Sequence, residues 1–225
     1  MTANVICICH QKGGAGKSTT TMQLAGTLGL RGHKTLVVDA DPQGTAIRWS
    51  ASAADDKPFP AQVAGMGAAG AKVHREVKKF ATDYDFIIID CPPAIDSPVP
   101  ESALLISDLA LVPCIPSPPD IWAANGITGL IERISGVNEG LKARLVINQI
   151  KEKTLLGREV KELLDNFGIE LVIAKLGQRE VYRHSALYGT TVHYFGKQAT
   201  DAIAEIESLA DEVCTILGVH LNEQK

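Results

Sequence analysis

The sequence predicts an α/β fold: a mostly parallel, twisted sheet with helices on both faces. Short, continuous apolar segments, which we expect to be buried strands, lie at residues 5–9, 35–38, 86–89, 109–112 and 145–147. Segments with helical periodicity lie between or after them, at residues 17–30, 71–81, 120–135, 157–167 and 199–217. Buried strands that alternate with helices are typical of a parallel sheet covered on both faces. Ligands bind such sheets outside the carboxyl ends of the strands, so the polar residues found there are the candidates for function.

The length and composition fit one domain spanning residues 1–225. Residues 50–72 are rich in Ala, Gly and Pro and are expected to form an irregular surface excursion. The net charge is −4, so the whole chain carries no nucleic-acid signal. No apolar run approaches the roughly 20 residues of a membrane helix, and we expect a cytoplasmic protein without a membrane partner. The five cysteines are expected to be buried free thiols.

A glycine-rich turn, Lys12–Thr19, follows the first expected strand and opens the first expected helix. Such a turn presents several backbone N–H groups and the positive end of a helix dipole to one point, which suits a phosphate. We expect Lys17 to contact the β- and γ-phosphates of ATP, Ser18 to ligate Mg²⁺, and Thr19 to contact the α-phosphate region. The residues expected to cradle the nucleotide are Gly13, Gly14, Ala15, Gly16, Lys17, Ser18 and Thr19.

The loop departs from the usual pattern G-x-x-x-x-G-K-[ST] at its start. Gln11 takes the place of the first glycine, and Lys12 follows it. A lysine so early in the loop cannot easily fold back onto its own γ-phosphate. We therefore expect Lys12 to reach a phosphate across a dimer interface and to neutralise charge that develops during phosphoryl transfer, as an arginine finger does. The alternative is a solvated loop lysine.

Three carboxylates, Asp39, Asp41 and Asp90, lie at the ends of expected strands. Asp90 follows four apolar residues, which is the Walker B arrangement, and we expect it to hold Mg²⁺. Asp41 lies in a turn suited to sensing the γ-phosphate. We assign Asp41 to positioning the attacking water and Asp39 to the supporting shell of the metal. The alternative for each is a helix cap, a position that aspartate favours.

Three segments together resemble the nucleotide motifs of the ParA-type partition ATPases, a branch of the deviant-Walker P-loop proteins that also includes MinD. These segments are Lys12–Thr19, Val37–Gly44 and Ile88–Pro93. The resemblance continues through Pro116–Ala123 and Ala202–Ile206, so it covers nearly the whole chain. The motifs are specific for the superfamily and less specific within it.

The resemblance implies an ATPase that uses ATP and Mg²⁺ and forms a homodimer around ATP, with the residue matching Lys12 crossing to the partner. It implies that the ATP dimer binds DNA without sequence preference, which would place the protein on the nucleoid. It also implies that a ParB-type partner stimulates weak hydrolysis, and that the cycle partitions plasmids or chromosomes. Asn148 matches the family's adenine-contacting asparagine, with a helix or turn cap as the alternative.

The chain departs from many relatives in two places. Larger partition ATPases carry an N-terminal helix-turn-helix domain, whereas here the phosphate loop starts at Lys12, so we expect the short class. Many relatives also have an Ile-Pro pair before the segment matching Arg179. This chain has Lys175–Gln178 instead, which leaves no proline there to contact adenine.

Arg179, Arg183 and Lys197 fall in the region that carries DNA-binding arginines in relatives. Non-specific DNA binding needs several basic side chains on one face. Arg179 and Arg183 are four residues apart, so a helix would place them together. The alternative is an ordinary solvated charged surface.

Two further functions stay open at this point. The same ATPase switch could position another cargo, such as a chemoreceptor cluster, a carboxysome, a conjugation complex or a cellulose-synthesis machine. The other function is that of an ATP-dependent ligase or synthetase on the same fold. Such an enzyme needs a polar substrate pocket, and Lys12 at the position of dimer crossing argues against it.

Overall fold

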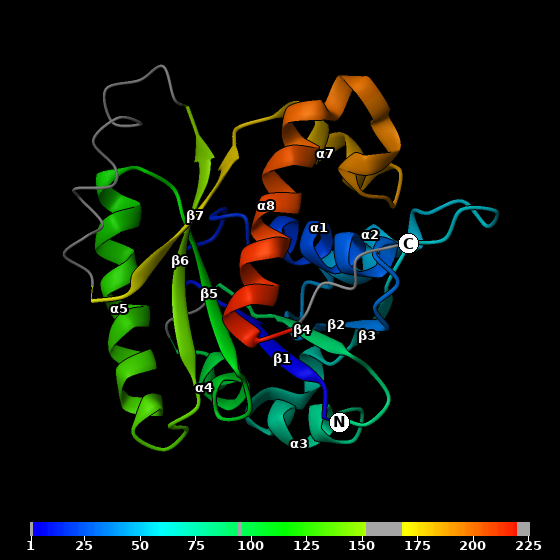
Figure 1. Cartoon of the computed structure of the whole chain (residues 1–225). Helices are drawn as coiled ribbons and strands as arrows, with labels where there is room; N and C mark the ends of the chain where they lie inside the picture. Colours follow the sequence, from blue (N-terminus) through cyan, green and yellow to red (C-terminus); the bar gives the residue numbers. More distant parts are fainter. Residues whose placement is uncertain (1, 94–95, 152–167, 220–225) are drawn as a thin grey trace.

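The computed structural model describes residues 2–93, 96–151 and 168–219, and these residues build one seven-stranded sheet (Figure 1). The strands are β1 (Asn4–Ile8), β2 (Thr35–Asp39), β3 (Gln62–Gly65), β4 (Phe86–Asp90), β5 (Leu109–Cys114), β6 (Lys142–Ile150) and β7 (Glu170–Gly177). Their order across the sheet is β3-β2-β4-β1-β5-β6-β7, and each pair of neighbours is parallel. The expected parallel α/β fold is therefore confirmed.

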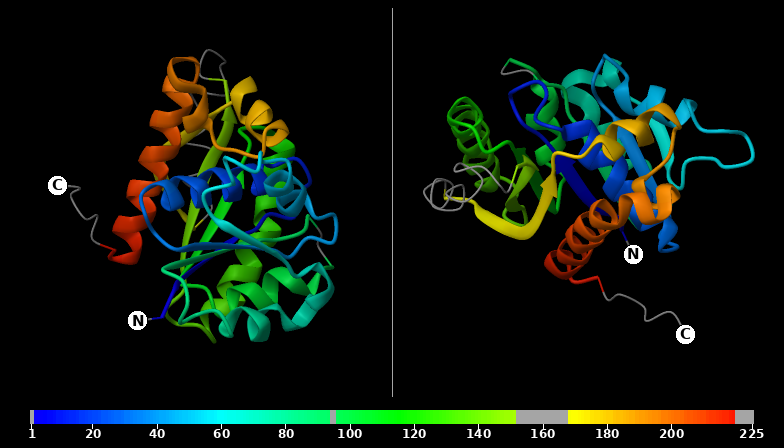
Figure 2. Two further views of the ribbon diagram at one scale, coloured as in Figure 1. Left: turned by 90° about the vertical axis from the view of Figure 1, so that its right-hand side faces the viewer. Right: turned by 90° about the horizontal axis from the view of Figure 1, so that it is seen from above.

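Helices cover both faces of the sheet. They are α1 (Lys17–Leu30), α2 (Thr45–Ala51), α3 (Val73–Lys78), α4 (Pro98–Leu104), α5 (Pro118–Ser135), α7 (Glu180–Leu187) and α8 (Thr200–Leu217), with the 3-10 segments η1 (Gly67–Lys72) and η3 (Val192–Ala199). The hydrophobic core on one face contains side chains of α3, α4 and α5, and the core on the other contains those of α1, α2, α7 and α8. Seen from above in Figure 2, α5 and α8 lie on opposite sides of the sheet.

The central strands are apolar along most of their length because both of their faces are buried. In β4, Ile87 and Ile89 belong to the core under α3, α4 and α5, whereas Ile88 belongs to the core under α1 and α8. All three side chains are fully buried. The continuous apolar pattern of the sequence therefore has a direct physical cause. The five cysteines are free and buried, as expected.

The sequence prediction was wrong in one segment and incomplete in others. Residues 50–72 are not only an irregular excursion, because β3 lies within them and pairs with β2 from Leu36 opposite Gln62 to Asp39 opposite Gly65. The helix expected at 71–81 is shorter, since α3 ends at Lys78. The elements α2, α4, α7 and β7 were not expected. The helix expected at 157–167 lies outside the described residues.

Strand β7, which the sequence analysis missed, is an edge strand with alternating exposure. Ile173 is 86% exposed, whereas Val172 and Ala174 are buried. Its free backbone edge is covered by α8, where the Glu212 carboxylate accepts hydrogen bonds from the Ile173 and Ala174 amides at 2.7 and 2.6 Å.

Among the described residues, none of the helices combines the length and apolar character needed to cross a membrane.

Candidate nucleotide site

The phosphate loop joins β1 to α1 at the carboxyl edge of the sheet. Gly14 has φ +79° and Gly16 has φ +90°, a region of backbone space that side chains with a Cβ rarely enter. Gly16 is also the N-cap of α1. A Cβ added to Gly16 would lie 1.9 Å from Asn148 Nδ2, so both the backbone and the neighbouring side chain require glycine there. The loop therefore has the close approach that a phosphate needs.

Two consecutive amides at the end of β6 hold the loop from the side. Asn148 Nδ2 donates to the Ala15 carbonyl at 2.8 Å, and Gln149 Nε2 donates to the Gly14 carbonyl at 2.8 Å. Gln149 has φ +52°, the one positive value outside glycine among the described residues. A strained residue of this kind persists only where its surroundings enforce it. The adenine contact predicted for Asn148 stays a prediction, because its amide nitrogen here serves the loop.

Lys17 is the first residue of α1 and is almost fully buried, with 6% of its surface exposed. Its Nζ donates to the Lys12 carbonyl at 3.2 Å, which places the ammonium inside the curve of the loop. Burial lowers the pKa of Lys17, and the carboxylate of Asp90 opposes that shift. The Lys12 amide donates to His10 Nδ1 at 3.0 Å, so the start of the loop is also fixed. The dimer-crossing role of Lys12 stays a prediction.

Asp90 ends β4 and is completely buried. Burial raises the pKa of Asp90 to about 7, and the nearby Ser18 hydroxyl acts in the opposite direction. Its Oδ1 faces the Thr21 hydroxyl at 3.5 Å, while Oδ2 has no hydrogen-bond partner among the described residues. A buried carboxylate oxygen without a partner is costly unless a cation completes its surroundings. Asp90 and Ser18 therefore fit a Mg²⁺ site.

The two other carboxylates differ in what they contact. Asp39 is buried, and its two oxygens accept from the Asp41 and Ile47 amides at 3.2 and 3.0 Å. These bonds shape the turn after β2, whereas the predicted place of Asp39 in the metal shell stays a prediction. Asp41 accepts from the Gln43 amide at 2.9 Å and is partly exposed to the cavity beside Lys17. That position suits the water-positioning role predicted for Asp41.

Two adjoining cavities form an elongated site. The larger, of about 310 Å³, is lined by Gly14, Gly16, Lys17, Ser18, Thr19, Asp41, Gln43, Thr45, Pro93 and Gln149. The smaller, of about 90 Å³, is lined by Gly16, Thr19, Asn148, Gln149, Gly177, Gln178, Arg179, Tyr182 and Arg183. Gly16, Thr19 and Gln149 line both. The first suits the phosphates, and the second, which shares three lining residues with it, is the candidate for the base.

Arg179 and Arg183, two of the residues predicted to bind DNA, lie at the start of α7 and both line the smaller cavity. Arg183 lies within α7, and Arg179 is its N-cap. The Arg179 guanidinium bonds Glu205 at 2.7 and 2.9 Å and Asp201 at 3.0 Å. Arg183 and Lys197 are exposed. DNA binding by these three residues stays a prediction, and Arg179 has two carboxylate partners within the chain.

Several residues of the site were not found from the sequence. Gln149, Gln178 and Tyr182 line the smaller cavity, and Thr21 faces Asp90. Gln149 follows Asn148 at a strand end, which is a signal that could have identified it. Gln178 and Tyr182 follow a strand that was itself missed, so no pattern pointed to them.

The comparisons with known proteins agree with this geometry. A family model described as the CobQ/CobB/MinD/ParA nucleotide binding domain matches residues 6–192. The maintenance of carboxysome distribution protein A of Halothiobacillus neapolitanus is 30% identical over 214 residues, covering 94% of this chain and 96% of the relative. The chromosome-partitioning ATPase Soj of Thermus thermophilus is 27% identical, covering 92% and 94%. The septum site-determining protein MinD of Pyrococcus horikoshii, complexed with Mg-ADP, has a TM-score of 0.77 at 22% identity, covering 99% and 100%.

Proposed function

We propose that this chain, which belongs to the CobQ/CobB/MinD/ParA nucleotide-binding family and within it to the ParA type, is a dimerising ATPase that positions a cargo in the cell. The observation that carries the proposal is the meeting of Lys17 and the fully buried Asp90 beneath a glycine loop. A buried amine and a buried carboxyl group held at the carboxyl edge of a parallel sheet suit a phosphate and its metal.

ATP and Mg²⁺ are the cofactors that these residues fit. The backbone amides of residues 13–19 and the Lys17 ammonium would hold the phosphates, and Ser18 and Asp90 would hold the metal. Bound Mg²⁺ would neutralise charge on the phosphate oxygens. The protein's own contribution to hydrolysis is to orient the attacking water through Asp41 and to supply Lys12 from a second subunit.

The similarity to carboxysome-distribution proteins favours cargo positioning over plasmid or chromosome partition. We therefore propose a carboxysome or a comparable intracellular assembly as the cargo. The similarity to Soj keeps chromosome partition, with a ParB-type partner, as the second candidate. In either cycle the ATP dimer must bind to a fixed surface in the cell. We propose that it binds the DNA of the nucleoid without sequence preference, through the exposed Arg183 and Lys197.

The proposal is tested first on the purified protein. Light scattering should show a monomer without nucleotide and a dimer with ATP and Mg²⁺, and phosphate release should be slow. Asp41→Ala should trap the ATP dimer because water is no longer oriented. A wild-type protein that neither binds ATP nor dimerises with it would refute the proposed ATPase switch.

The cargo is tested in the source organism. Deleting the gene should leave fluorescently labelled carboxysomes clustered, while a labelled chromosomal origin or resident plasmid keeps its distribution. The opposite pattern, with normal carboxysome spacing and lost plasmids or misplaced origins, would replace the first candidate by the second. The proposed DNA binding is tested separately, by measuring binding to DNA of arbitrary sequence with ATP and with ADP.

A further inference from the structure

One carboxylate of α8 holds the connection from β7 to α7 at three points. Glu205 Oε2 accepts from the Gly177 amide at 3.0 Å and from the Tyr182 hydroxyl at 2.9 Å. Glu205 Oε1 accepts from Arg179 Nε at 2.9 Å and from Arg179 Nη2 at 2.7 Å. Charge-assisted bonds to arginine are among the stronger hydrogen bonds in proteins. The three residues therefore take their positions from one side chain on a distant helix.

The three residues held by Glu205 all line the smaller cavity of the nucleotide site. Glu205 itself is not among the residues that line that cavity. Contact between Gly177 and this group is close, because an added Cβ would lie 3.0 Å from Glu205 Oε1 and 3.1 Å from Arg179 Nε. The wall of the cavity thus has little freedom to move independently of α8.

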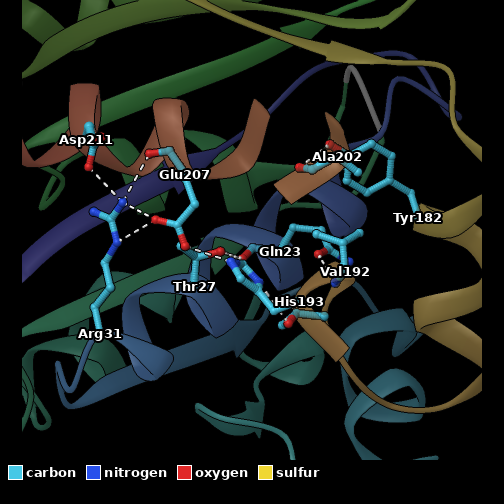
Figure 3. A network of polar contacts seen from close by, with 10 residues as sticks. Gln23, Thr27, Arg31, Tyr182, Val192, His193, Ala202, Glu207 and Asp211 are labelled. Carbon is cyan, nitrogen blue, oxygen red and sulfur yellow. Dashed lines mark hydrogen bonds and ion pairs between the residues drawn. The ribbon is translucent and has the colours of Figure 1, made fainter. Parts of the chain in front are cut away.

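Tyr182 makes a second contact with α8, through the backbone of Ala202. Its single hydroxyl hydrogen is shared between Glu205 and the Ala202 carbonyl, which lies 3.3 Å from the phenol oxygen, and Figure 3 shows Tyr182 beside Ala202. Burial and the nearby Glu205 raise the pKa of Tyr182, so the phenol stays protonated and remains a donor. The two contacts with α8 hold the ring at the edge of the cavity.

The far end of the α7 connection is held by α1, the helix that carries Lys17. Gln23 is fully buried and donates through Nε2 to the Ser185 hydroxyl at 2.7 Å. Its Oε1 accepts from the Val192 amide at 3.0 Å, and Figure 3 shows this contact from α1 to η3. The segment between β7 and η3 is thus fixed between the helix of the phosphate loop and α8.

We propose that Glu205 is a positioning residue for nucleotide-base recognition: it fixes Gly177, Arg179 and Tyr182 as one wall of the base pocket, opposite Asn148 and Gln149. The inference rests on the proposed ATP site and adds to it a role for α8. It also gives Arg179 a role at the nucleotide in place of one at DNA. We expect Glu205 to affect binding of the base and not of the phosphates, because the three residues that it holds line the smaller cavity.

The test compares ATP with inorganic tripolyphosphate, which carries the phosphates without a base. Both are titrated with Mg²⁺ into the full chain as the wild type and as Glu205→Gln, a variant that keeps the side-chain volume and removes the charge. We expect ATP to bind about tenfold more weakly to the variant, the size of one charge-assisted hydrogen bond, and tripolyphosphate to bind equally well. The KM for ATP should rise while kcat is kept, as expected for binding that is uniform along the reaction.

Glu212→Gln is the matched control. Glu212 lies on the same helix and accepts from the Ile173 and Ala174 amides of β7, neither of which lines the smaller cavity. It should lower the melting temperature about as much as Glu205→Gln and leave the affinity for ATP unchanged. This control separates general loosening of α8 on the sheet from a specific effect on the base pocket.

Three results would overturn the inference. They are an unchanged ATP affinity in Glu205→Gln, an equal loss of ATP and tripolyphosphate binding, and an equal loss of ATP binding in Glu212→Gln. A wild type that binds tripolyphosphate as tightly as ATP would overturn the base pocket alone and leave the phosphate loop intact. A wild type that binds neither ligand would overturn the proposed ATPase function as well.

Discussion

Replacing Gly16 by alanine tests the fit between the phosphate loop and the end of β6. The substitution has two separable costs. A Cβ at φ +90° is strained, which costs about 1–2 kcal/mol. The same Cβ would lie 1.9 Å from Asn148 Nδ2, so Asn148 must move and its bond to the Ala15 carbonyl is lost, at a further cost of about 1–2 kcal/mol. We expect Gly16→Ala to lower the free energy of unfolding by about 2–4 kcal/mol.

The chain offers a control with the strain and without the collision. Gly14 has φ +79° in the same loop, but a Cβ there would meet nothing within 4 Å. Gly14→Ala should therefore show only the strain, about 1–2 kcal/mol. Adding Asn148→Ala should restore part of the stability of Gly16→Ala and none of that of Gly14→Ala, because only the first pair collides.

The assay is urea unfolding of the single and double variants without nucleotide, with the linear extrapolation to water. ATP binding is measured in parallel and is expected to be weaker in Gly16→Ala than in Gly14→Ala. Equal destabilisation by the two glycine substitutions would refute the collision with Asn148. Strict additivity of Gly16→Ala and Asn148→Ala would refute it independently.

Three further predictions concern charged side chains. Lys17→Ala should weaken ATP binding about a hundredfold or more, measured by calorimetry, and retained tight binding would contradict the phosphate-loop assignment. Lys12→Ala should bind ATP as a monomer and lose hydrolysis and dimerisation. Normal ATP turnover by this variant would contradict the proposed action of Lys12 on the nucleotide of a second subunit. Burial alone would raise the pKa of Glu207, but hydrogen bonds from Arg31 and His193 lower it. The stability due to Glu207 is therefore present at neutral pH and lost as the pH falls through that lowered pKa, so the unfolding free energies of the wild type and Glu207→Gln should converge below pH 4.5, the ordinary value. A difference that does not depend on pH would contradict this pairing.

The phosphate end of the site could be predicted from the sequence because it is local. One strand, one loop and one helix follow each other from Asn4 to Leu30. The glycines and Lys17 of this motif can be recognised without knowing which distant residues pack around them. Asp90 was found because β4 is buried on both faces and its apolar run ends at that residue. Local order along the chain is sufficient for these features.

The base end could not be predicted because it is assembled from distant parts of the chain. Gly177, Arg179 and Tyr182 contact Glu205 across 28, 26 and 23 residues. Strand β7 was itself missed, although Leu171–Ala174 is a continuous apolar run. The carboxylate partners of Arg179 could not be predicted from its four-residue spacing with Arg183, because Glu205 and Asp201 lie on another helix.

Gln23 of α1 connects the two ends of the site, because it links the helix of the phosphate loop to the segment from α7 to η3. Both polar atoms of its buried amide are engaged, one by Ser185 and one by the Val192 amide. A displacement of α1 that broke either bond would leave a buried polar group unsatisfied, at a cost of about 1–3 kcal/mol. The segment from α7 to η3 therefore moves with α1 more cheaply than against it. We expect a shift of the N-terminus of α1 at the phosphates to move the wall of the proposed base pocket as well, so that both ends of the site would respond together to one nucleotide.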